Sequence, residues 1–238
     1  MDETITAGGS SPSPVPERVM LDAEPEPLEI DRRRTGVVIV DMQNAFLTKG
    51  AYFDLRGFDI QPGRAAIEPI KRISNTARAK GCRVIYLVTV HHPGDAGTGP
   101  DSVHWHKEGS LVLYREHPEL QDKLLLPGTW GAGIVRELEP ERDDTVVEQP
   151  RYSGFFDTNL EILLKRYNLK YLLTVGIATN CCIEATVRDA YYRGYFSIVI
   201  LDATAALGPE FMQEAAIFNI KTLFGWTTTT ENAIRALT

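Results

Sequence analysis

Cysteine, long apolar runs and excess positive charge are all scarce in this chain of 238 residues. Its three cysteines, two of them adjacent, are too few for a disulfide framework, so we expect a reducing compartment, the cytoplasm. No apolar run has the length of about 20 residues that spans a bilayer, and no charged segment followed by an apolar one suggests a secretory signal. The net charge of −7 argues against nucleic acids and anionic membranes as partners.

Histidine is also scarce, and all five histidines lie between His91 and His117. They belong to a polar, glycine-rich segment, residues 91–131, which we expect to form a lid or binding loop. His104 and His106 with Asp101 offer zinc-type ligands. Because a His-x-His pair in a loop more often contacts solvent or substrate, we expect no metal site.

The composition divides the chain into an N-terminal arm, residues 1–30, and one domain, residues 31–238. The arm is rich in proline and glycine, and prolines at this density exclude regular elements, so we expect an extended or mobile segment. It is long enough to cross a neighbouring subunit, and we expect a homo-oligomer. The remaining residues suit a single large α/β domain.

Short apolar runs that alternate with helical patterns predict the fold class. We expect strands at residues 35–41, 82–90, 145–148, 170–176, 195–202 and 227–230. Helical periodicity separates them, as in residues 65–80, which have an apolar face and end at Gly81. This alternation predicts a doubly wound, mostly parallel sheet of about six strands with helices on both faces.

Two adjacent cysteines follow the strand predicted at residues 170–176 and precede an apolar helical pattern that starts at Ile183. We expect Asn180 to cap the helix, which places Cys182 in the first turn, where free N–H groups and the helix dipole favour a thiolate. Free cysteines are usually small core residues. Since the two side chains cannot both point inward, we assign Cys182 a functional role and Cys181 a packing role.

Asp41 ends the first predicted strand, a run of mostly β-branched residues that is typical of a parallel sheet buried on both faces. Ligands of open parallel sheets gather at the carboxyl ends of the strands, so Asp41 is a candidate site residue. The alternative is a structural carboxylate that caps the following turn.

Three blocks of sequence resemble the isochorismatase-like cysteine hydrolases. They are VIVDMQNAF at residues 38–46, PRYSGFF at 150–156 and GIATNCCIE at 176–184, and the likeness extends over most of residues 35–226. Within the family the chain is most similar to the ureidoacrylate-type amidohydrolases of bacterial pyrimidine degradation. The resemblance implies an isochorismatase-like fold and cleavage of the C–N bond of a small ureido or carbamoyl acid, with no cofactor and with a small-molecule amide or ureido substrate as the partner.

The resemblance also implies roles for individual residues. Cys182 matches the family nucleophile, which forms a covalent intermediate with the substrate, and Asp41 matches the general base. The backbone N–H groups of Ala178 and Cys182 match the oxyanion hole. A cis peptide characteristic of the family would join Ile177 and Ala178.

Gln149 departs from the family, which has a lysine at this catalytic position. A lysine would lower the pKa of the thiol, whereas glutamine donates a hydrogen bond without a charge, and one missing electrostatic donor costs about two to three orders of magnitude in rate. Three explanations stay open: an engineered inactive variant, a natural enzyme that uses another cation, and a relative without hydrolytic activity. Lys107 and Lys123 are candidates for the other cation.

The resemblance places Thr89 and His91 in the substrate pocket, at positions where related enzymes have asparagine and tryptophan. Tyr152, Phe46 and Trp130 are further candidates for the pocket lining, and core packing is the alternative for Phe46 and Trp130. These departures leave amide hydrolysis better supported than ureidoacrylate recognition.

Two other functions compete with hydrolysis by a cysteine. The first is a catalytically silent binding or regulatory protein, which Gln149 favours and the intact Asp41 and Cys182 disfavour. The second is a vinyl-ether hydrolase of the isochorismatase type, which needs an aspartate acid but no cysteine.

Overall fold

The computed structural model describes residues 15–94 and 97–238 and contains a parallel sheet of six strands in the order β5-β4-β3-β6-β7-β8. All neighbouring strands in this sheet run parallel. The prediction of a doubly wound parallel sheet with about six strands is therefore confirmed. The strands are β3 (Thr35–Val40), β4 (Arg83–Thr89), β5 (Thr145–Gln149), β6 (Tyr171–Ile177), β7 (Phe196–Ala205) and β8 (Trp226–Thr228).

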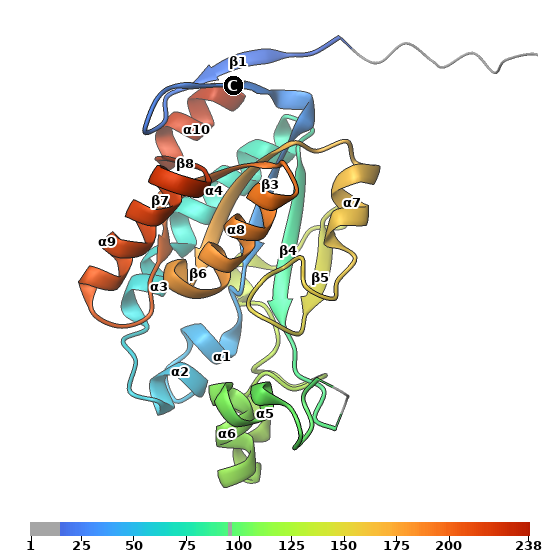
Figure 1. The fold of residues 1–238 in the computed structure, drawn as a ribbon, viewed down its shortest axis with the longest axis vertical. Coiled ribbons are helices and arrows are strands. Elements are labelled where there is room, and N and C mark those ends of the chain that lie inside the picture. Colours follow the sequence, from blue (N-terminus) through green and yellow to red (C-terminus); the bar gives the residue numbers. More distant parts are fainter. Residues whose placement is uncertain (1–14, 95–96) are drawn as a thin grey trace, which may run out of the picture.

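Helices cover both faces of the sheet (Figure 1). One face carries α3 (Gln61–Ala65), α4 (Ile67–Ala79) and α10 (Thr230–Leu237), and the other carries α7 (Leu160–Arg166), α8 (Glu184–Tyr192) and α9 (Glu210–Asn219). In the part of the chain that the structure describes, none of the helices has the length and apolar character to cross a membrane.

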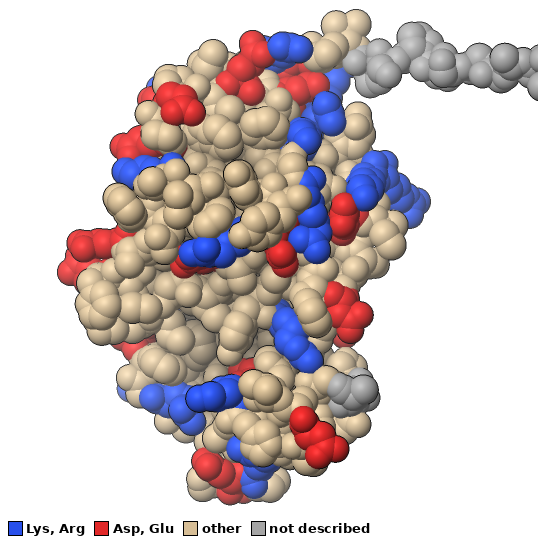
Figure 2. All heavy atoms as spheres, viewed as in Figure 1, with Lys and Arg blue, Asp and Glu red and all other residues tan. Residues whose placement is uncertain are grey.

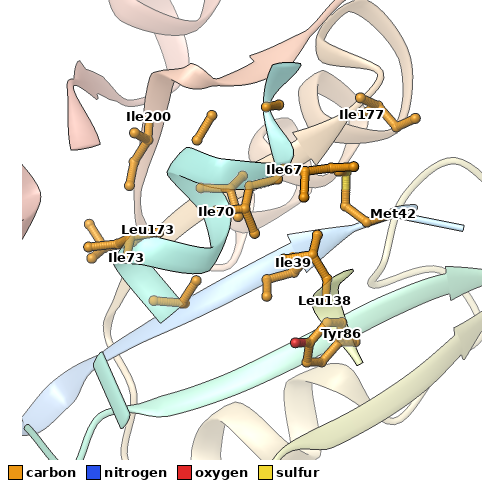
Figure 3. Close-up of a cluster of buried hydrophobic side chains, with 14 of the residues drawn as sticks. Ile39, Met42, Ile67, Ile70, Ile73, Tyr86, Leu138, Leu173, Ile177 and Ile200 are labelled. Carbon is orange, nitrogen blue, oxygen red and sulfur yellow. The ribbon is translucent and has the colours of Figure 1, made fainter. Parts of the chain in front are cut away.

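The sheet separates the core into two layers, and the central strand β3 contributes side chains to both of them. Val37 and Ile39 face the cluster beneath α4, whereas Val38 and Val40 face the cluster beneath α7 and α8. Figure 3 shows the first layer, in which Ile70 of α4 lies against the sheet beside Ile39. Both side chains are fully buried, and truncating such a residue to alanine typically costs about 2–5 kcal/mol. Burial on both faces explains why the strand is almost continuously apolar.

The N-terminal arm contains regular structure, so the prediction that proline excludes it is wrong for the described part of the arm. Strands β1 (Arg18–Leu21) and β2 (Leu28–Asp31) form an antiparallel pair. Pro25 and Pro27 lie in the connection between them, where no ladder hydrogen bond is needed. Leu21 and Ile30 are buried in the core, which stabilises the pair. Residues 1–14 lie outside the described part.

The polar segment of residues 91–131, predicted as a loop, contains two short helices, α5 (Val103–Lys107) and α6 (Gly109–Glu116), and a 3-10 turn (Pro118–Lys123). Together with α1 (Asn44–Leu47) and α2 (Tyr52–Leu55) they lie beyond the carboxyl ends of the strands (Figure 1). Glu108 separates α5 from α6 and caps α6 by accepting the backbone N–H of Leu111. The segment therefore covers the edge of the sheet where ligands of this fold class bind.

Side chains of both charge signs are interspersed on the face of the molecule shown in Figure 2. Several of them form ion pairs, such as Arg188–Glu184 and Arg193–Glu161. Solvent-accessible pairs of this kind, here partly buried, contribute about 0–1 kcal/mol each to stability. They keep this face electrically mixed despite the net charge of −7.

Candidate functional site

The carboxyl ends of three adjacent strands meet at Asp41. Asp41 follows β3, Thr89 ends β4 and Gln149 ends β5. The Oδ1 atom of Asp41 accepts hydrogen bonds from the Thr89 backbone N–H at 3.0 Å, from Thr89 Oγ1 at 2.8 Å and from Gln149 Nε2 at 3.0 Å. Asp41 adopts a φ of +53°, which turns the chain sharply out of the strand. The local backbone thus fixes a buried carboxylate at the centre of the strand ends.

Gln149 is fully buried and holds the carboxylate with a neutral donor. Its Nε2 also donates to Thr89 Oγ1 at 3.2 Å, while its Oε1 has no hydrogen-bond partner among the described residues. Lys107 and Lys123, the candidate replacement cations, are both exposed and do not line the cavity beside Asp41. The fold therefore does not bring either of them to this site.

Burial sets the proton affinity of Asp41. It raises the pKa of the carboxyl group from 3.8 to about 6, although hydrogen bonds from Cys182, Thr89 and Gln149 oppose the rise. The Oδ2 atom has no hydrogen-bond partner among the described residues. At neutral pH the carboxylate is ionised but readily accepts a proton, which is the property that a general base needs.

Cys182 lies in a single π-helical turn (Thr179–Ile183) between β6 and α8. Its side chain is buried and lines the same cavity as Asp41. The hydrogen bond with Cys181, burial and the negative charge of Asp41 raise the pKa of Cys182 well above its ordinary value. The prediction that the helix terminus favours a thiolate is wrong, because these three effects outweigh the dipole. The group therefore rests as a thiol beside the Asp41 carboxylate.

Asn180 and Cys181 also differ from their predicted roles. Asn180 does not cap the helix, because its side chain instead bonds the backbone N–H and C=O of Leu207 at 2.8 and 3.0 Å. Cys181 packs against the core, but it also lines the same cavity as Cys182, and the two sulfur atoms are 4.0 Å apart. The π turn places both thiols at the cavity, which a regular helix pattern does not predict.

A cavity with about 470 Å³ of free space, part of it open to solvent, adjoins these groups. Of the predicted pocket residues, Phe46, Thr89 and Tyr152 line it, as does Ala178, one of the two predicted oxyanion-hole residues. The peptide between Ile177 and Ala178 is cis, as the resemblance implies. The full lining is Asp41, Phe46, Tyr52, Phe53, Thr89, Glu108, Leu125, Tyr152, Ile177, Ala178, Cys181, Cys182 and Leu207.

The structure does not bring His91 and Trp130 to the cavity wall. The His91 ring is buried behind it, with Nε2 at 3.3 Å from Glu108 Oε2, and so supports a wall residue instead of being one. The Trp130 side chain is 46% exposed, and its backbone contacts Asn44 and Asp122 outside the cavity. Core packing, the alternative for Trp130, does not hold for this exposed side chain either.

The two histidines considered for a zinc site have different surroundings. The His104 ring lies against His91 and Tyr152, and burial lowers the pKa of His104 to about 4, so it is neutral at pH 7. His106 Nε2 instead lies 2.8 Å from the Pro100 carbonyl. Within residues 15–94 and 97–238 no group of three His, Cys, Asp or Glu side chains is placed to hold a metal ion.

Sequence reasoning missed Glu108, Tyr52 and Gln43. Glu108 and Tyr52 come from the short helices beyond the sheet, and both line the cavity. Gln43 is fully buried; its Oε1 accepts the Thr89 backbone N–H at 2.8 Å and its Nε2 donates to the Thr89 carbonyl at 2.9 Å. Only its place directly after a strand end, beside Asp41, marked Gln43 in the sequence. A single acidic residue in a polar segment carried no such signal for Glu108.

Comparison with known proteins confirms the resemblance seen in the sequence. The model of the isochorismatase domain matches residues 35–232. The ureidoacrylate amidohydrolase RutB of Rhizobium rhizogenes is 43% identical over 231 residues, covering 96% of this chain and 94% of its own. The same enzyme of Agrobacterium fabrum is 46% identical over 211 residues, covering 88% and 92% of the two chains.

A solved structure shows the same architecture. A cysteine hydrolase from Pseudomonas syringae superposes with a TM-score of 0.71 at 26% identity, covering 87% of this chain and 94% of its own. The sequence matches and this structural match agree over the domain that carries Asp41 and Cys182. The chain belongs to the isochorismatase family.

Proposed function

We propose that the protein is an amidohydrolase that cleaves the C–N bond of a small ureido or carbamoyl acid, of the ureidoacrylate type, through a covalent intermediate on Cys182. The observation that carries the proposal is the buried Cys182 thiol beside the Asp41 carboxylate, with both groups at the wall of one cavity. The relatives named above are ureidoacrylate amidohydrolases, which supports the reaction class.

The first step follows from the protonation states. Cys182 rests as a thiol and Asp41 as a carboxylate, so Asp41 takes the thiol proton as Sγ attacks the substrate carbonyl. Negative charge then develops on the carbonyl oxygen, and we assign its stabilisation to the backbone N–H groups of Ala178 and Cys182. Protonated Asp41 returns the proton to the leaving nitrogen as the C–N bond breaks.

Water completes the reaction. Asp41, again a carboxylate, activates a water molecule that attacks the carbon atom bound to Sγ, and the thiol regains its proton. When the acid product is a carbamate, it decomposes to ammonia and carbon dioxide. No cofactor enters any of these steps.

Gln149 acts as a positioning residue. Its Nε2 holds the Asp41 atom Oδ1, whereas Oδ2 has no hydrogen-bond partner among the described residues. Because glutamine is neutral, it orients the carboxylate without lowering its proton affinity through charge. The site therefore keeps a base and a nucleophile, but no lysine or arginine among the described residues lines the cavity to stabilise developing negative charge. We expect a slower enzyme than one with lysine at this position.

One activity assay distinguishes the proposed amidohydrolase from the two competing functions, the catalytically silent protein and the vinyl-ether hydrolase. Turnover is followed as ammonia release and substrate loss over a panel of ureido acids, carbamoyl compounds and simple amides. The proposal expects a trapped adduct on Cys182, detected by mass spectrometry, and loss of activity on thiol alkylation. Turnover that survives complete alkylation of Cys182 supports the vinyl-ether hydrolase. Absence of both turnover and adduct supports the silent protein.

The proposal includes a reducing, cytoplasmic setting and a homo-oligomer. The three cysteines are free thiols, as a reducing compartment requires. Exposed aromatic side chains gather on α8 and α9, among them Tyr192 at 70% and Phe218 at 63% exposure, and a second copy of the chain would cover them. Analytical ultracentrifugation tests the assembly, and a monomer at micromolar concentration contradicts it.

A further inference from the structure

The cavity beside Asp41 carries a second thiol that the proposed reaction does not use. Cys181 is half-buried and lines the same cavity as the proposed nucleophile, Cys182. The two sulfur atoms are 4.0 Å apart. The third cysteine of the chain, Cys82, lies directly before β4, at the end of the sheet opposite to the cavity, and its sulfur contacts the Arg32 carbonyl. Of the three cysteines, only Cys181 and Cys182 can therefore act on one ligand.

The π-helical turn accounts for the arrangement of the two thiols. In a regular α-helix consecutive side chains point about 100° apart around the axis and do not face each other. Thr179–Ile183 instead forms one π turn, in which the Ile183 N–H bonds the carbonyl of Ala178, five residues earlier, at 3.2 Å. Both sulfur-bearing side chains of this turn reach the cavity wall. A ligand that enters the cavity therefore meets two neighbouring thiols.

Two thiols at this separation suit a soft centre that binds sulfur. Two thiolates bound to one zinc ion at about 2.3 Å each can lie up to about 4.6 Å apart, and the separation of 4.0 Å falls within this span. A protein zinc site usually has at least three protein ligands, but among the described residues no group of three His, Cys, Asp or Glu side chains is placed to hold a metal ion. Trivalent arsenic fits better, because it binds two thiols and keeps its third bond for an organic group.

We propose that Cys181 and Cys182 form a dithiol site that binds trivalent organic arsenicals, which then occupy the cavity. With phenylarsonous acid, the form that phenylarsine oxide takes in water, two As–O bonds break and two As–S bonds form. Each thiol proton leaves with an arsenic hydroxyl as water, and arsenic stays trivalent, so no oxidant or reductant is needed. The phenyl group has room in the free space of about 470 Å³, whose walls include Phe46, Phe53 and Tyr152. Binding requires only the two thiols and does not depend on the proposed hydrolysis.

Phenylarsine oxide added to the folded, reduced, full-length protein tests the site. Intact-protein mass spectrometry counts the phenylarsenic groups on each chain, and thiol titration in urea counts the thiols that remain free. We expect one group per chain and the loss of two of the three free thiols. The adduct should survive an excess of 2-mercaptoethanol but be removed by 2,3-dimercaptopropanol, because only a dithiol replaces both As–S bonds within one molecule.

Cys181→Ser and Cys182→Ser each leave one thiol in the cavity, and each should weaken binding at least about hundredfold in competition with 2-mercaptoethanol, since a second linked bond strengthens binding by about 10²–10⁴. Cys82→Ala is the matched control and should bind as the native protein does. Circular dichroism checks that each variant is folded. Undiminished binding by either serine variant, or removal of the native adduct by 2-mercaptoethanol, overturns the dithiol site. Because these measurements require no turnover, the proposed hydrolysis stands or falls separately.

Discussion

Replacing Asp41 by asparagine should abolish hydrolysis and at the same time stabilise the protein at neutral pH. Asparagine has the same shape and tolerates the positive φ of this position, but it cannot take the Cys182 proton. The hydrogen bonds from Thr89 and Gln149 go to Oδ1, which the amide oxygen can replace. If the carboxylate merely capped the turn, its substitution would instead destabilise the protein. The two roles therefore predict changes of opposite sign in the unfolding free energy.

The size of the effect follows from the pKa of the buried carboxyl group. Folding raises it from 3.8 to about 6, which corresponds to about 3 kcal/mol. Below about pH 4 the group is protonated in both states and the folded protein bears no cost. Between about pH 4 and pH 6 the unfolded chain releases this proton while the folded protein still holds it, so the unfolding free energy falls by about that amount and levels off above pH 6. Asp41→Asn does not ionise, and its advantage should grow from near zero at pH 4 to about 3 kcal/mol at pH 7.

Urea unfolding followed by circular dichroism at pH 4, 5, 6 and 7 measures this dependence. Any constant difference between aspartate and asparagine cancels, because the prediction concerns the change with pH. Asp143→Asn, at an exposed position, is the control and should track the native protein throughout. A difference between Asp41→Asn and native protein that stays constant with pH, or hydrolysis that persists in the variant, refutes the assignment of Asp41 as a buried general base.

Substitutions at four further positions test the site and the strand that leads into it. Gln149→Lys should raise kcat/KM at least about tenfold, which corresponds to roughly 1.4 kcal/mol of barrier, and it should move the acid limb of the pH profile below 6 by lowering the pKa of Asp41. The control Gln149→Met should change neither the rate upward nor the pH profile downward. An unchanged rate and pH profile in the lysine variant would contradict our account of this position. Cys182→Ser should eliminate turnover while Cys181→Ser retains most of it, and equal losses in two folded variants would remove the assignment of the nucleophile. Gly176→Ala should lower the unfolding free energy by at least about 2 kcal/mol. Gly176 has a φ of +112°, and a Cβ atom there would lie 2.1 Å from the Val40 carbonyl oxygen. An unaltered urea midpoint would show that β6 can shift away from β3.

The parallel sheet was predictable because its strands are buried on both faces. Continuous apolar runs such as residues 35–40 leave few alternatives to a central strand, and the helical patterns between them require crossovers. The β1–β2 hairpin was not predictable in the same way. Its stability comes from Leu21 and Ile30, which are buried against distant parts of the chain, whereas its local composition favours irregular structure.

The parts of the site that lie at strand ends were predictable, and those on the short helices were not. Asp41, Thr89 and Gln149 each end or follow a strand, so parallel pairing alone brings them together. Glu108 reaches the cavity because α5 and α6 fold over the strand ends, and helices of five and eight residues leave little periodicity to detect. The raised pKa of Cys182 depends on burial and on Asp41, neither of which can be read from its position before a helix.

The neutral surroundings of Asp41 decide which part of the reaction Gln149 weakens. Without a cation, the pKa of Asp41 and that of Cys182 are both raised, so the base gains proton affinity as the thiol holds its proton more firmly. The pKa of the thiol is still the higher of the two, so a free thiolate is disfavoured and proton transfer must accompany attack on the carbonyl. A lysine would lower the pKa values of both Asp41 and Cys182, so the free energy of proton transfer between them would change little. Its main effect would be to stabilise the negative charge that develops on the substrate oxygen. The loss caused by glutamine therefore falls mainly on stabilisation of the oxyanion, for which the backbone N–H groups of Ala178 and Cys182 are the donors we assign.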